Sequence, residues 1–530
     1  MPVFAAPDDV INFPDDNLRK ALADATYHYM FNGDVWDAPI DTNGDGKITQ
    51  RELGQANTLE LWNASISNLE GLQYAVNAID VFLNGNIRDL SPLAGLTQVK
   101  VLEVVGGEVK NIVPLAGLTN LLELHLSSNE VSDITPLAKL TALRWLSLDN
   151  NEISDVSPLA ALTELKVLNI WDNCISDMTP LAGLTQLTQL SIINNYIDIG
   201  ENSIGLSVIK SLELNGVKVY YNPQTPLPFT RQSGSNRITT ALNIAQTGWP
   251  TGAETVILTS GRGFADALAG GSLSASLDAP LLLTSNLPTG LEDDVLNTIK
   301  DLKAKNVVIL GGTGTVSTDI EEALKAQGLD VERRSGGNRY ETAVDIATAL
   351  YENAEFDTVF LADGNNYPDA LAGAPVSGIL GQPILFTNSK DKNVREETLN
   401  FIEENGIKNV VILGGSSSVS DEVKKALEDK NIEVSRISGG NRYETALNIY
   451  NAYRDIFTGD TITITTGTNF PDALAGSAYS AKIGAPLFLL ANTLNNANIR
   501  TAITSSGKED FLVYGGSGSL SNAAVLRHVL

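Results

Sequence analysis

The sequence predicts a multi-domain α/β protein, with an N-terminal solenoid of short parallel strands followed by three tandem modules. Each module is expected to hold a parallel sheet covered on both faces by helices. Two repeats of different length support this organisation. In the first half prolines recur every 22 residues, at Pro92, Pro114, Pro136, Pro158 and Pro180. In the second half the segment Asp-Ala-Leu-Ala-Gly recurs every 103 residues, a domain-sized step, beginning at Asp266, Asp369 and Asp472.

Composition restricts the classes of partner. The 530 residues carry a net charge of −27. Residues 1–230 contain 12 basic and 28 acidic side chains, and the remainder contains 24 and 35. Neither half has a basic excess, which argues against nucleic acid as the partner. An anionic ligand would need local Arg or Lys side chains, backbone N–H groups or bridging cations.

The N-terminal residues, the single cysteine and the lack of long apolar runs bear on where in the cell the protein is found. Cys174 is alone, so an intrachain disulfide is excluded, which suits a cytosolic protein or an exported one without disulfides. No apolar run approaches the roughly 20 residues of a membrane span. Val3-Phe4-Ala5 fits the end of a signal peptide. We interpret Met1 as a start added to a mature secreted chain; the alternative is an ordinary cytosolic N-terminus.

Residues 1–57 are predicted to cap the solenoid. A helix start at Pro14 is followed by an amphipathic segment that would cover an exposed end. The cap also contains a twelve-residue stretch that matches an EF-hand calcium loop, with Gly46 at its sharp turn. The predicted Ca²⁺ ligands are Asp41, Asn43, Asp45, the carbonyl of Lys47, Thr49 and Glu52. The alternative is an acidic turn without metal.

Residues 58–220 follow the pattern Leu-x-x-Leu-x-Leu-x-x-Asn-x-Ile/Val, in which Leu124 and Leu126 point inward from a short strand. With its Pro-Leu-Ala-x-Leu-Thr segment, this 22-residue form resembles the internalin type of leucine-rich repeat. Pro136 is expected in a short 3₁₀ segment. The pattern extends back to Leu59, Leu61, Ala64 and Ile66, and forward to a last rung with Ile209, Leu212, Leu214 and Val219.

The outward strand positions are predicted to form a concave face that binds a protein or glycan. Exposed aromatic side chains on an open sheet favour a partner that covers them, although scattered surface aromatics are the simpler interpretation. The predicted contact residues are Trp62, Phe82, His125, Trp145, Trp171 and Ile193, with Val105 on the same face.

A proline-rich linker, 221–230, separates the halves. The three modules are assigned to residues 231–334, 335–437 and 438–530. Within the second, apolar strands at 358–362, 383–387, 409–413 and 433–437 alternate with helices, as in a parallel sheet covered on both faces.

Two features of each module are candidate ligand contacts. Each third strand ends in a Gly-Gly pair: Gly311 and Gly312, Gly414 and Gly415, Gly515 and Gly516. These pairs lack a nucleotide-binding fingerprint, so each is either a tight turn or an anion site at a helix start. Arg237, Arg339 and Arg442 begin helices, where a cation is unfavourable. Each is expected to bridge its own repeat's Asp or to face a ligand.

The segments Asn-Arg-Tyr-Glu-Thr-Ala, Asp-Ala-Leu-Ala-Gly and Val-Val-Ile-Leu-Gly-Gly resemble the type 2 cell-wall-binding repeat of Gram-positive, especially clostridial, surface proteins. The resemblance covers about residues 231–530. It implies three modules around a pseudo-threefold axis that bind an anionic wall polysaccharide without a covalent bond. The first copy departs at Ile238-Thr239, and the third has Tyr514 and a shortened end.

We therefore expect a secreted protein of the cell wall or cell surface, anchored by its second half and displaying its solenoid for adhesion or recognition. The alternatives are an S-layer component or a wall-associated hydrolase, since this module also accompanies peptidoglycan amidases. A zinc amidase would need converging His and Glu ligands. The histidines, His28, His125 and His528, are spread over cap, solenoid and C-terminus, so we predict no enzymatic activity.

Overall fold

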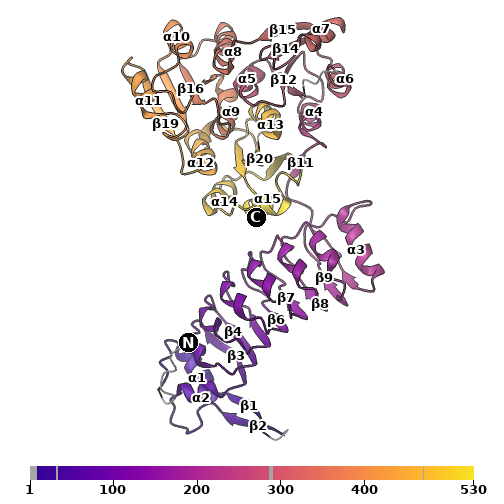
Figure 1. The fold of residues 1–530 in the computed structure, drawn as a ribbon, viewed down its shortest axis with the longest axis vertical. Coiled ribbons are helices and arrows are strands. Elements are labelled where there is room, and N and C mark those ends of the chain that lie inside the picture. The colour runs from indigo at the N-terminus through magenta and orange to yellow at the C-terminus, as the bar shows by residue number, and fades with distance from the viewer. Residues whose placement is uncertain (1–8, 32–33, 286–289, 470) are drawn as a thin grey trace. The chain divides into compact units, whose positions relative to one another are not determined.

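The computed structural model describes residues 9–31, 34–285, 290–469 and 471–530. The interpretation of Val3-Phe4-Ala5 concerns residues outside this part. The chain forms two compact units, Met1–Leu227 and Pro228–Leu530 (Figure 1). One continuous hydrophobic cluster fills the first unit, and separate clusters fill the second.

The N-terminal cap is joined to the solenoid through Asp15. This residue caps the expected helix, where one carboxylate oxygen accepts hydrogen bonds from the N–H groups of Asn17 and Leu18. The other oxygen accepts from the N–H groups of Ser67 and Asn68 in the first turn of the solenoid. The elements of the cap are α1 (Asp16–Asp24), β1 (Thr26–Phe31), β2 (Asp34–Pro39) and α2 (Gln50–Gly54).

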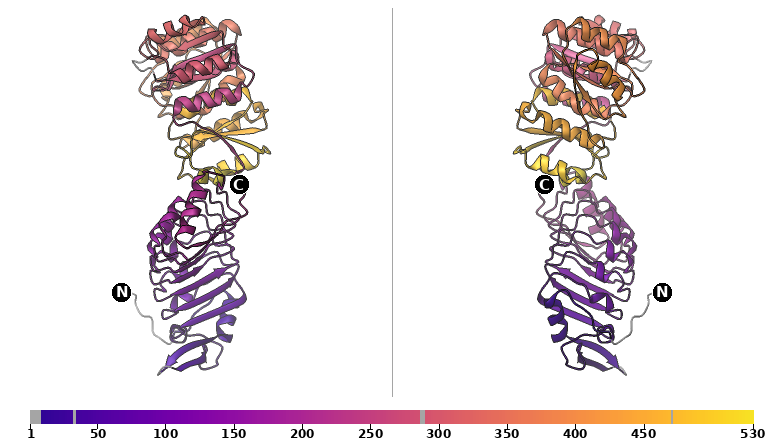
Figure 2. Two further views of the ribbon diagram at one scale, coloured as in Figure 1. Left: turned by 90° about the vertical axis from the view of Figure 1, so that its right-hand side faces the viewer. Right: turned by 90° about the vertical axis from the view of Figure 1, so that its left-hand side faces the viewer.

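The solenoid is an eight-stranded parallel sheet in which strands pair in chain order (Figure 2). A 3₁₀ segment lies opposite most strands, as Pro136 predicts, because proline tolerates the first positions of such a turn. The strands are β3 (Thr58–Ile66), β4 (Asp80–Gly85), β5 (Val101–Val105), β6 (Glu123–His125), β7 (Trp145–Ser147), β8 (Val167–Asn169), β9 (Gln189–Ser191) and β10 (Lys218–Tyr220). The 3₁₀ segments are η1 (Leu72–Tyr74), η2 (Ser91–Leu93), η3 (Val113–Gly117), η4 (Thr135–Lys139), η5 (Ser157–Ala161) and η6 (Thr179–Gly183).

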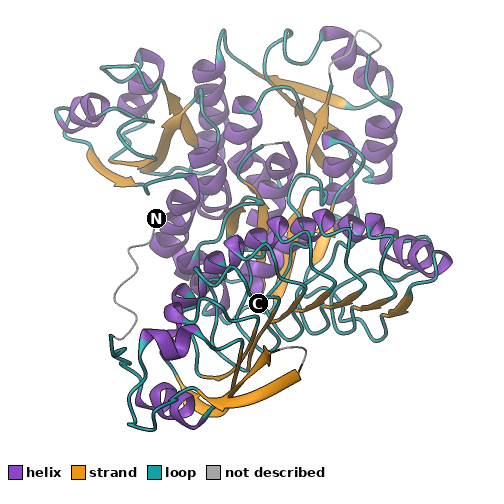
Figure 3. Cartoon of the chain, turned by 60° about the horizontal axis from the view of Figure 1, so that its bottom comes forward, coloured by secondary structure: helices purple, strands orange, loops and turns teal. Residues whose placement is uncertain are grey.

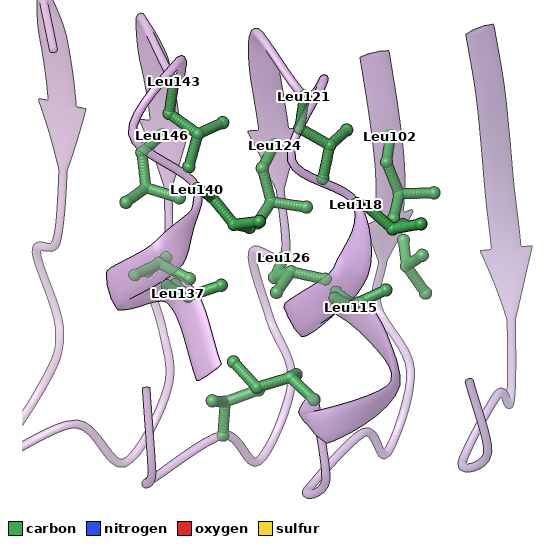
Figure 4. Packing of buried hydrophobic residues seen from close by; sticks show 14 of the residues in the cluster. Leu102, Leu115, Leu118, Leu121, Leu124, Leu126, Leu137, Leu140, Leu143 and Leu146 are labelled. Carbon is green, nitrogen blue, oxygen red and sulfur yellow. The ribbon is translucent and has the colours of Figure 1, made fainter. Parts of the chain in front are cut away.

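Leucines from strand and 3₁₀ segment meet in the interior of each rung and stack on those of the next. Leu124 and Leu126 on the strand side face Leu115 and Leu118 on the 3₁₀ side, and all four are completely buried (Figure 4). Complete burial of such a side chain contributes about 1.5–3 kcal/mol. Each rung depends on its neighbours, because an isolated rung leaves both sides of this layer exposed.

A ladder of buried asparagines closes the rungs at the turn after each strand. The Asn151 side-chain N–H group donates to the carbonyls of Leu126 at 2.9 Å and Leu148 at 3.1 Å, while its oxygen accepts from the N–H of Val131 at 2.9 Å. One side chain thus satisfies backbone groups of two adjacent rungs. The same contacts recur at Asn129, Asn173 and Asn195.

The forward extension of the pattern to Leu212 and Leu214 as a strand is wrong. Residues 204–214 form an α-helix, α3 (Ile204–Leu214), and the last strand is β10. Val208, Ile209 and Leu212 cover the end of the core, whereas Leu214 is 89% exposed. The spacing of apolar residues here fits one face of a helix as well as it fits a rung.

The second unit contains three four-stranded parallel sheets with the strand orders β13-β12-β14-β15, β17-β16-β18-β19 and β21-β20-β22-β11. Helices lie on both faces of the sheets (Figure 3). The strands are β11 (Thr230–Gln232), β12 (Thr255–Ser260), β13 (Leu281–Thr284), β14 (Asn306–Leu310), β15 (Asp330–Arg334), β16 (Thr358–Asp363), β17 (Ile384–Thr387), β18 (Asn409–Leu413), β19 (Glu433–Ile437), β20 (Thr461–Thr466), β21 (Leu487–Leu490) and β22 (Asp510–Tyr514). The helices are α4 (Arg237–Gly248), α5 (Ala265–Ser276), α6 (Asp293–Asp301), α7 (Thr318–Ala326), α8 (Arg339–Asn353), α9 (Pro368–Leu380), α10 (Glu396–Glu404), α11 (Asp421–Glu428), α12 (Arg442–Tyr453), η7 (Arg454–Ile456), α13 (Pro471–Lys482), α14 (Ala497–Thr504) and α15 (Asn522–Val529).

The three helices that carry Asp-Ala-Leu-Ala-Gly, α5, α9 and α13, pack against one another at the centre of this unit (Figure 1). Small residues permit the approach. A Cβ on Gly378 would lie 2.6 Å from that of Ala481 and 3.1 Å from that of Ala275. Within the first module, a Cβ on Gly270 would clash with the Leu310 side chain. The glycine that ends the motif is therefore required by packing within its module, and small residues later in these helices permit their close approach.

The modules close into a ring. Each helix that starts at a motif arginine contacts the central helix of the preceding module and a strand of its own: α8 contacts α5 and β17, α12 contacts α9 and β21, and α4 contacts α13 and β13. The third sheet takes its last strand from the beginning of the unit, because β11 pairs with β22. The shortened end of the third repeat is thus completed by residues 230–232.

We expect Asn151→Ala to lower the free energy of unfolding of the first unit by roughly 2–4 kcal/mol, because backbone groups of two rungs lose buried partners. Asn120→Ala, which removes one exposed bond to the Thr97 carbonyl, should cost less than about 1 kcal/mol. Denaturant unfolding measures both values. Equal costs would contradict the structural role of the ladder.

We expect Arg231→Ala to destabilise the second unit by roughly 2–4 kcal/mol, because the ring closure depends on buried bonds of this guanidinium. Arg231 donates to the Gly515 carbonyl at 2.7 Å and to Asn522 Oδ1 at 2.8 Å. Arg454→Ala, at a side chain 72% exposed, is the control. Thermal unfolding of the full chain measures the melting temperature of the second unit. If Arg231→Ala leaves this temperature as unchanged as Arg454→Ala does, the role of Arg231 in ring closure is contradicted.

Candidate functional site

The largest cleft bounded by recurrent motif residues lies at the carboxyl edge of the first sheet. The strand order reverses between β12 and β14, and in open parallel sheets ligands bind outside the strand ends at such a point. A cleft of about 690 Å³ opens there. Its walls come from the start of α5, the Gly-Gly turn after β14 and the motif that starts α8. They include Ser260, Phe264, Asp266, Gly312, Thr315, Gly337, Asn338 and Arg339.

The partly buried carboxylate of Asp266 lines this cleft. Burial raises its pKa, while the charge of Arg339 and a hydrogen bond from Thr315 act in the opposite direction. Gly311 has a φ of +101°, and a Cβ there would lie 2.5 Å from Oδ2 of Asp266. The first glycine of the pair is therefore required by a close approach of this carboxylate.

Gly312, the second glycine of the pair, has a different environment. A Cβ on it would meet nothing closer than the Gly336 carbonyl at 4.0 Å. The same division holds in the other modules. Gly414 and Gly515 have positive φ and lie against Asp369 and Asp472, whereas Gly415 and Gly516 face open space.

The motif arginines do not bridge to their own repeat's Asp. The carboxylate whose charge interacts with Arg339 is Asp266 of the preceding repeat. Arg442 likewise acts on Asp369, and Arg237 acts on Asp472 around the ring. Within the described residues, no direct ion pair joins these groups.

The arginines are held instead by backbone carbonyls. Arg237 donates to the Gly261 carbonyl at 2.6 Å, and Arg339 and Arg442 donate to those of Gly364 and Gly467, each at 2.5 Å. The guanidinium of Arg339 also lies 5.8 Å from the Phe264 ring centroid, and that of Arg442 lies 5.7 Å from that of Tyr367. Each arginine is thereby fixed at the boundary between two modules.

The cleft recurs at the other module boundaries of the ring, but its volume differs between copies. The second copy, beside Asp369, Gly415 and Arg442, has a volume of about 160 Å³. The corresponding groups of the third copy are Asp472, Gly516 and Arg237, and they interact in the same way. The first cleft is thus about four times the volume of the second.

The helix starts in the first two clefts are uncapped by side chains. Phe264 and Tyr367 occupy the N-cap positions of α5 and α9, and neither supplies a side-chain hydrogen bond there. Backbone N–H groups of a first turn attract anions. An arginine and a glycine turn face the same space.

A second set of arginines was missed in the sequence. Arg231, Arg333 and Arg436 donate to the carbonyls of Gly515, Gly311 and Gly414, which ties the strand before each motif to the Gly-Gly turn. Burial lowers the pKa of Arg231 to about 10. The signal was available, because each precedes the serine of its Ser-Gly motif by two residues.

The departures noted in the first and third repeats are structural. Glu341 accepts from the N–H of Gly337 and stabilises the motif turn; in the first copy the Thr239 hydroxyl accepts from the Asn236 N–H instead. Tyr514 replaces Leu310 and Leu413 in the core. Its buried hydroxyl lies 3.1 Å from that of Ser480, and burial raises its pKa.

The concave face of the solenoid carries the predicted aromatic side chains. Trp62, Trp145 and Trp171 are 42%, 41% and 37% exposed. Phe82, His125 and Ile193 are partly buried on the same face. The rings of Trp62 and Phe82 lie 5.4 Å apart, and those of His125 and Trp145 lie 5.9 Å apart.

The EF-hand-like loop has the expected turn, but its carboxylates have protein partners. The N–H groups of Gly44 and Gly46, both at positive φ, donate to the two oxygens of Asp41. Asn43 and Asp45 accept from the N–H groups of Asp45 and Lys47. Both oxygens of Glu52 accept from Thr42 and Thr49, and Thr49 and Glu52 form a capping box.

The described residues contain neither a clustered metal site nor a membrane-spanning helix. No three His, Cys, Asp or Glu side chains in this part of the chain are grouped as a metal site. No helix in the same ranges has the length and apolar character needed to cross a bilayer. His528 is buried against the Ala524 carbonyl, and burial lowers its pKa.

Comparisons with known proteins match both units. The family model of cell wall binding domain 2 (CWB2) matches residues 231–321, 333–424 and 436–525. A model of Leucine Rich repeats (2 copies) matches residues 119–161 and 141–183. These matches confirm the resemblance to wall-binding repeats and leucine-rich repeats.

Individual relatives match part of their length. N-acetylmuramoyl-L-alanine amidase LytC of Bacillus subtilis is 32% identical over 291 residues, which are 55% of this chain and 56% of the amidase. Cwp6 from Clostridium difficile has a TM-score of 0.52 at 24% identity, covering 57% of this chain and 48% of that chain. Cwp8 from the same organism has a TM-score of 0.50 at 24% identity, covering 61% and 55%. The chain thus spans about half the length of these proteins, and the two structures show a shared fold.

The three family matches together cover more than half of the 530 residues. The chain therefore belongs to the cell wall binding domain 2 family and is a cell-wall-associated protein.

Proposed function

We propose that the second unit holds the chain non-covalently to an anionic polysaccharide of the cell wall, at the clefts of its ring. The cleft beside Asp266 carries this proposal, because it combines an uncapped helix start, an arginine and a glycine turn. The solenoid then presents its concave face to a separate partner. We infer a secreted adhesion or recognition protein.

The local chemistry offsets the acidic charge of the chain. An anionic group in the first cleft would meet the N–H groups at the start of α5 and the guanidinium of Arg339, which Phe264 and a carbonyl hold in place. Asp266 opposes an anion, but its raised pKa reduces that repulsion as the pH falls. Polymer binding should therefore strengthen as the pH falls towards the pKa of this carboxyl group.

Several weak clefts suit a repetitive polymer. Once one sugar unit is bound, the next cleft meets the same chain at a high effective concentration, so total affinity exceeds that of any cleft. The repetition of weak sites therefore favours a binding role for the ring over a catalytic one. The similarity to the amidase falls in the wall-binding region, so we propose that the shared part is an anchor.

The test places a negative charge in the open part of each cleft. The triple variant Gly312→Asp, Gly415→Asp and Gly516→Asp should reduce retention on purified wall polysaccharide by about tenfold or more, because like charges are then brought together. These positions have space for a side chain and lack a positive φ. The melting temperature of the second unit should be nearly unchanged.

Gly117→Asp is the matched control, since a Cβ there meets nothing within 4 Å and the residue belongs to the solenoid. It should leave retention at the wild-type level. Full retention by the triple variant, or equal loss in the control, would overturn the proposal that the clefts bind the polymer.

We also propose that the loop at residues 41–52 binds Ca²⁺. The turn and the oxygens of Asp41, Asn43 and Asp45 suit an oxygen-seeking cation, with the Lys47 carbonyl and Thr49 completing the set. Glu52 would have to exchange its hydrogen bonds with Thr42 and Thr49 for the ion. The calcium would serve the cap as a structural ion.

Calcium at a hundred times its Kd should stabilise the first unit by about 2.7 kcal/mol, measured as a rise in its melting temperature over a chelator-treated sample. Asp45→Ala should remove this rise. Glu70→Gln, at an exposed residue outside the loop, should keep it. If the melting temperature of the wild type is the same with Ca²⁺ and with chelator, the loop is an acidic turn without metal.

A further inference from the structure

The outward positions of the solenoid strands combine aromatic and acidic side chains without basic ones. Within β3 to β9, the outward strand positions carry four carboxylates and no Lys or Arg: Glu60, Asp80, Glu103 and Glu123. Asp149 follows β7 by two residues, and the nearest basic side chains, Lys100, Arg144 and Lys166, lie one residue before β5, β7 and β8. A surface of this charge repels the anionic polymer proposed for the second unit and attracts cations.

Acid and aromatic residues are paired across neighbouring strands. Glu60 lies opposite Phe82 in the ladder, and Glu123 lies opposite Trp145. Asp149 and Trp171 repeat the arrangement 22 residues apart at the ends of β7 and β8. In each pair, the acid precedes the aromatic by one rung.

A second aromatic side chain lies beside two of these acid–aromatic pairs. Trp62 lies 5.4 Å from Phe82, and His125 lies 5.9 Å from Trp145. His125 Nε2 is also 3.9 Å from a carboxylate oxygen of Glu123. A carboxylate beside an aromatic face is the combination that holds an ammonium or guanidinium group, through charge and cation–π attraction.

We propose that the concave face binds a polypeptide segment with basic side chains, one at the Glu60–Phe82 pair and one at the Glu123–Trp145 pair. The proposal rests on the proposed role of the solenoid as a recognition surface and names its partner class. A neutral or anionic glycan is the alternative that the experiment excludes.

The ladder also sets the spacing of the basic residues. The two pairs are three strands apart, from β4 to β7, which is on the order of 14 Å at the usual strand separation. An extended chain advances about 3.3 Å per residue, so 14 Å corresponds to about four residues. Side chains at positions i and i+4 of an extended segment also point to the same side.

The experiment uses the full chain and three synthetic probes in isothermal titration at low salt. The first probe has two lysines at i and i+4 in a Gly/Ser/Thr background, the second has them at i and i+3, and the third has glutamates at i and i+4. The first should bind at least about fivefold more tightly than the second. The third should not bind, and added salt should weaken the first.

Variants locate the binding. Glu123→Gln and Trp145→Ala should each weaken the first probe by about threefold to tenfold. Glu164→Gln removes one exposed carboxylate from another part of the solenoid and should leave the affinity unchanged. Circular dichroism and melting temperature check that all variants are folded.

The inference is overturned if the first probe fails to bind at millimolar concentration, or if Glu164→Gln weakens it as much as Glu123→Gln. Tighter binding of a neutral chito-oligosaccharide than of the lysine probe also overturns it. Retention on wall polysaccharide, measured on the same samples, reports on the second unit. If the wild-type chain is not retained on wall polysaccharide, wall anchoring is contradicted, whereas the result for the concave face still holds.

Discussion

The second unit depends on the carboxylate that begins each Asp-Ala-Leu-Ala-Gly segment, which is buried at Asp369 and partly buried at Asp266 and Asp472. Asp266, Asp369 and Asp472 lie against a glycine of positive φ in their own module and interact with the motif arginine of the next. Burying a carboxylate is costly unless it is hydrogen-bonded and close to a cation. That requirement fixes the Gly-Gly turn, the neighbouring hydroxyls and the position of the arginine together. The clefts exist because these groups must meet where two modules adjoin.

Ring closure follows from the same requirement. In the third module the charges that act on the carboxylate of Asp472 are those of Arg237 and Arg231, from the start of the unit. β11 brings Arg231 to this place by pairing with β22, and Arg231 then binds the Gly515 carbonyl. The first and last segments of the unit are therefore bonded to each other, and the third sheet is complete only when residues 230–232 have joined it. This arrangement couples the stability of the three modules.

Much of this was predictable from sequence, because the repeats report positions that every copy must satisfy. The strands expected at residues 409–413 and 433–437 match β18 and β19. The sequence could not reveal which segment completes the third sheet, because strand exchange between the ends leaves no trace in local periodicity. It suggested a bridge from each arginine to its own Asp, because spacing along the chain says nothing about which module is adjacent. The prediction of a solenoid rung at Leu212 and Leu214 failed for another reason, because apolar residues at such intervals suit a helix as well as a rung.

The two units solve opposite problems with respect to charge. The ring belongs to an acidic chain, so any site for an anionic polymer must be made locally, from helix N–H groups and from arginines that carbonyls and aromatic rings hold in place. The solenoid has no such constraint, and its open ladder leaves Trp62, Trp145 and Trp171 exposed on the concave face. On the proposals made above, its acid–aromatic pairs would favour a cation there and disfavour an anionic polymer bound by the ring. Such a division of charge would keep the concave face from binding the wall, because the same polymer would be attracted at the clefts and repelled at the concave face.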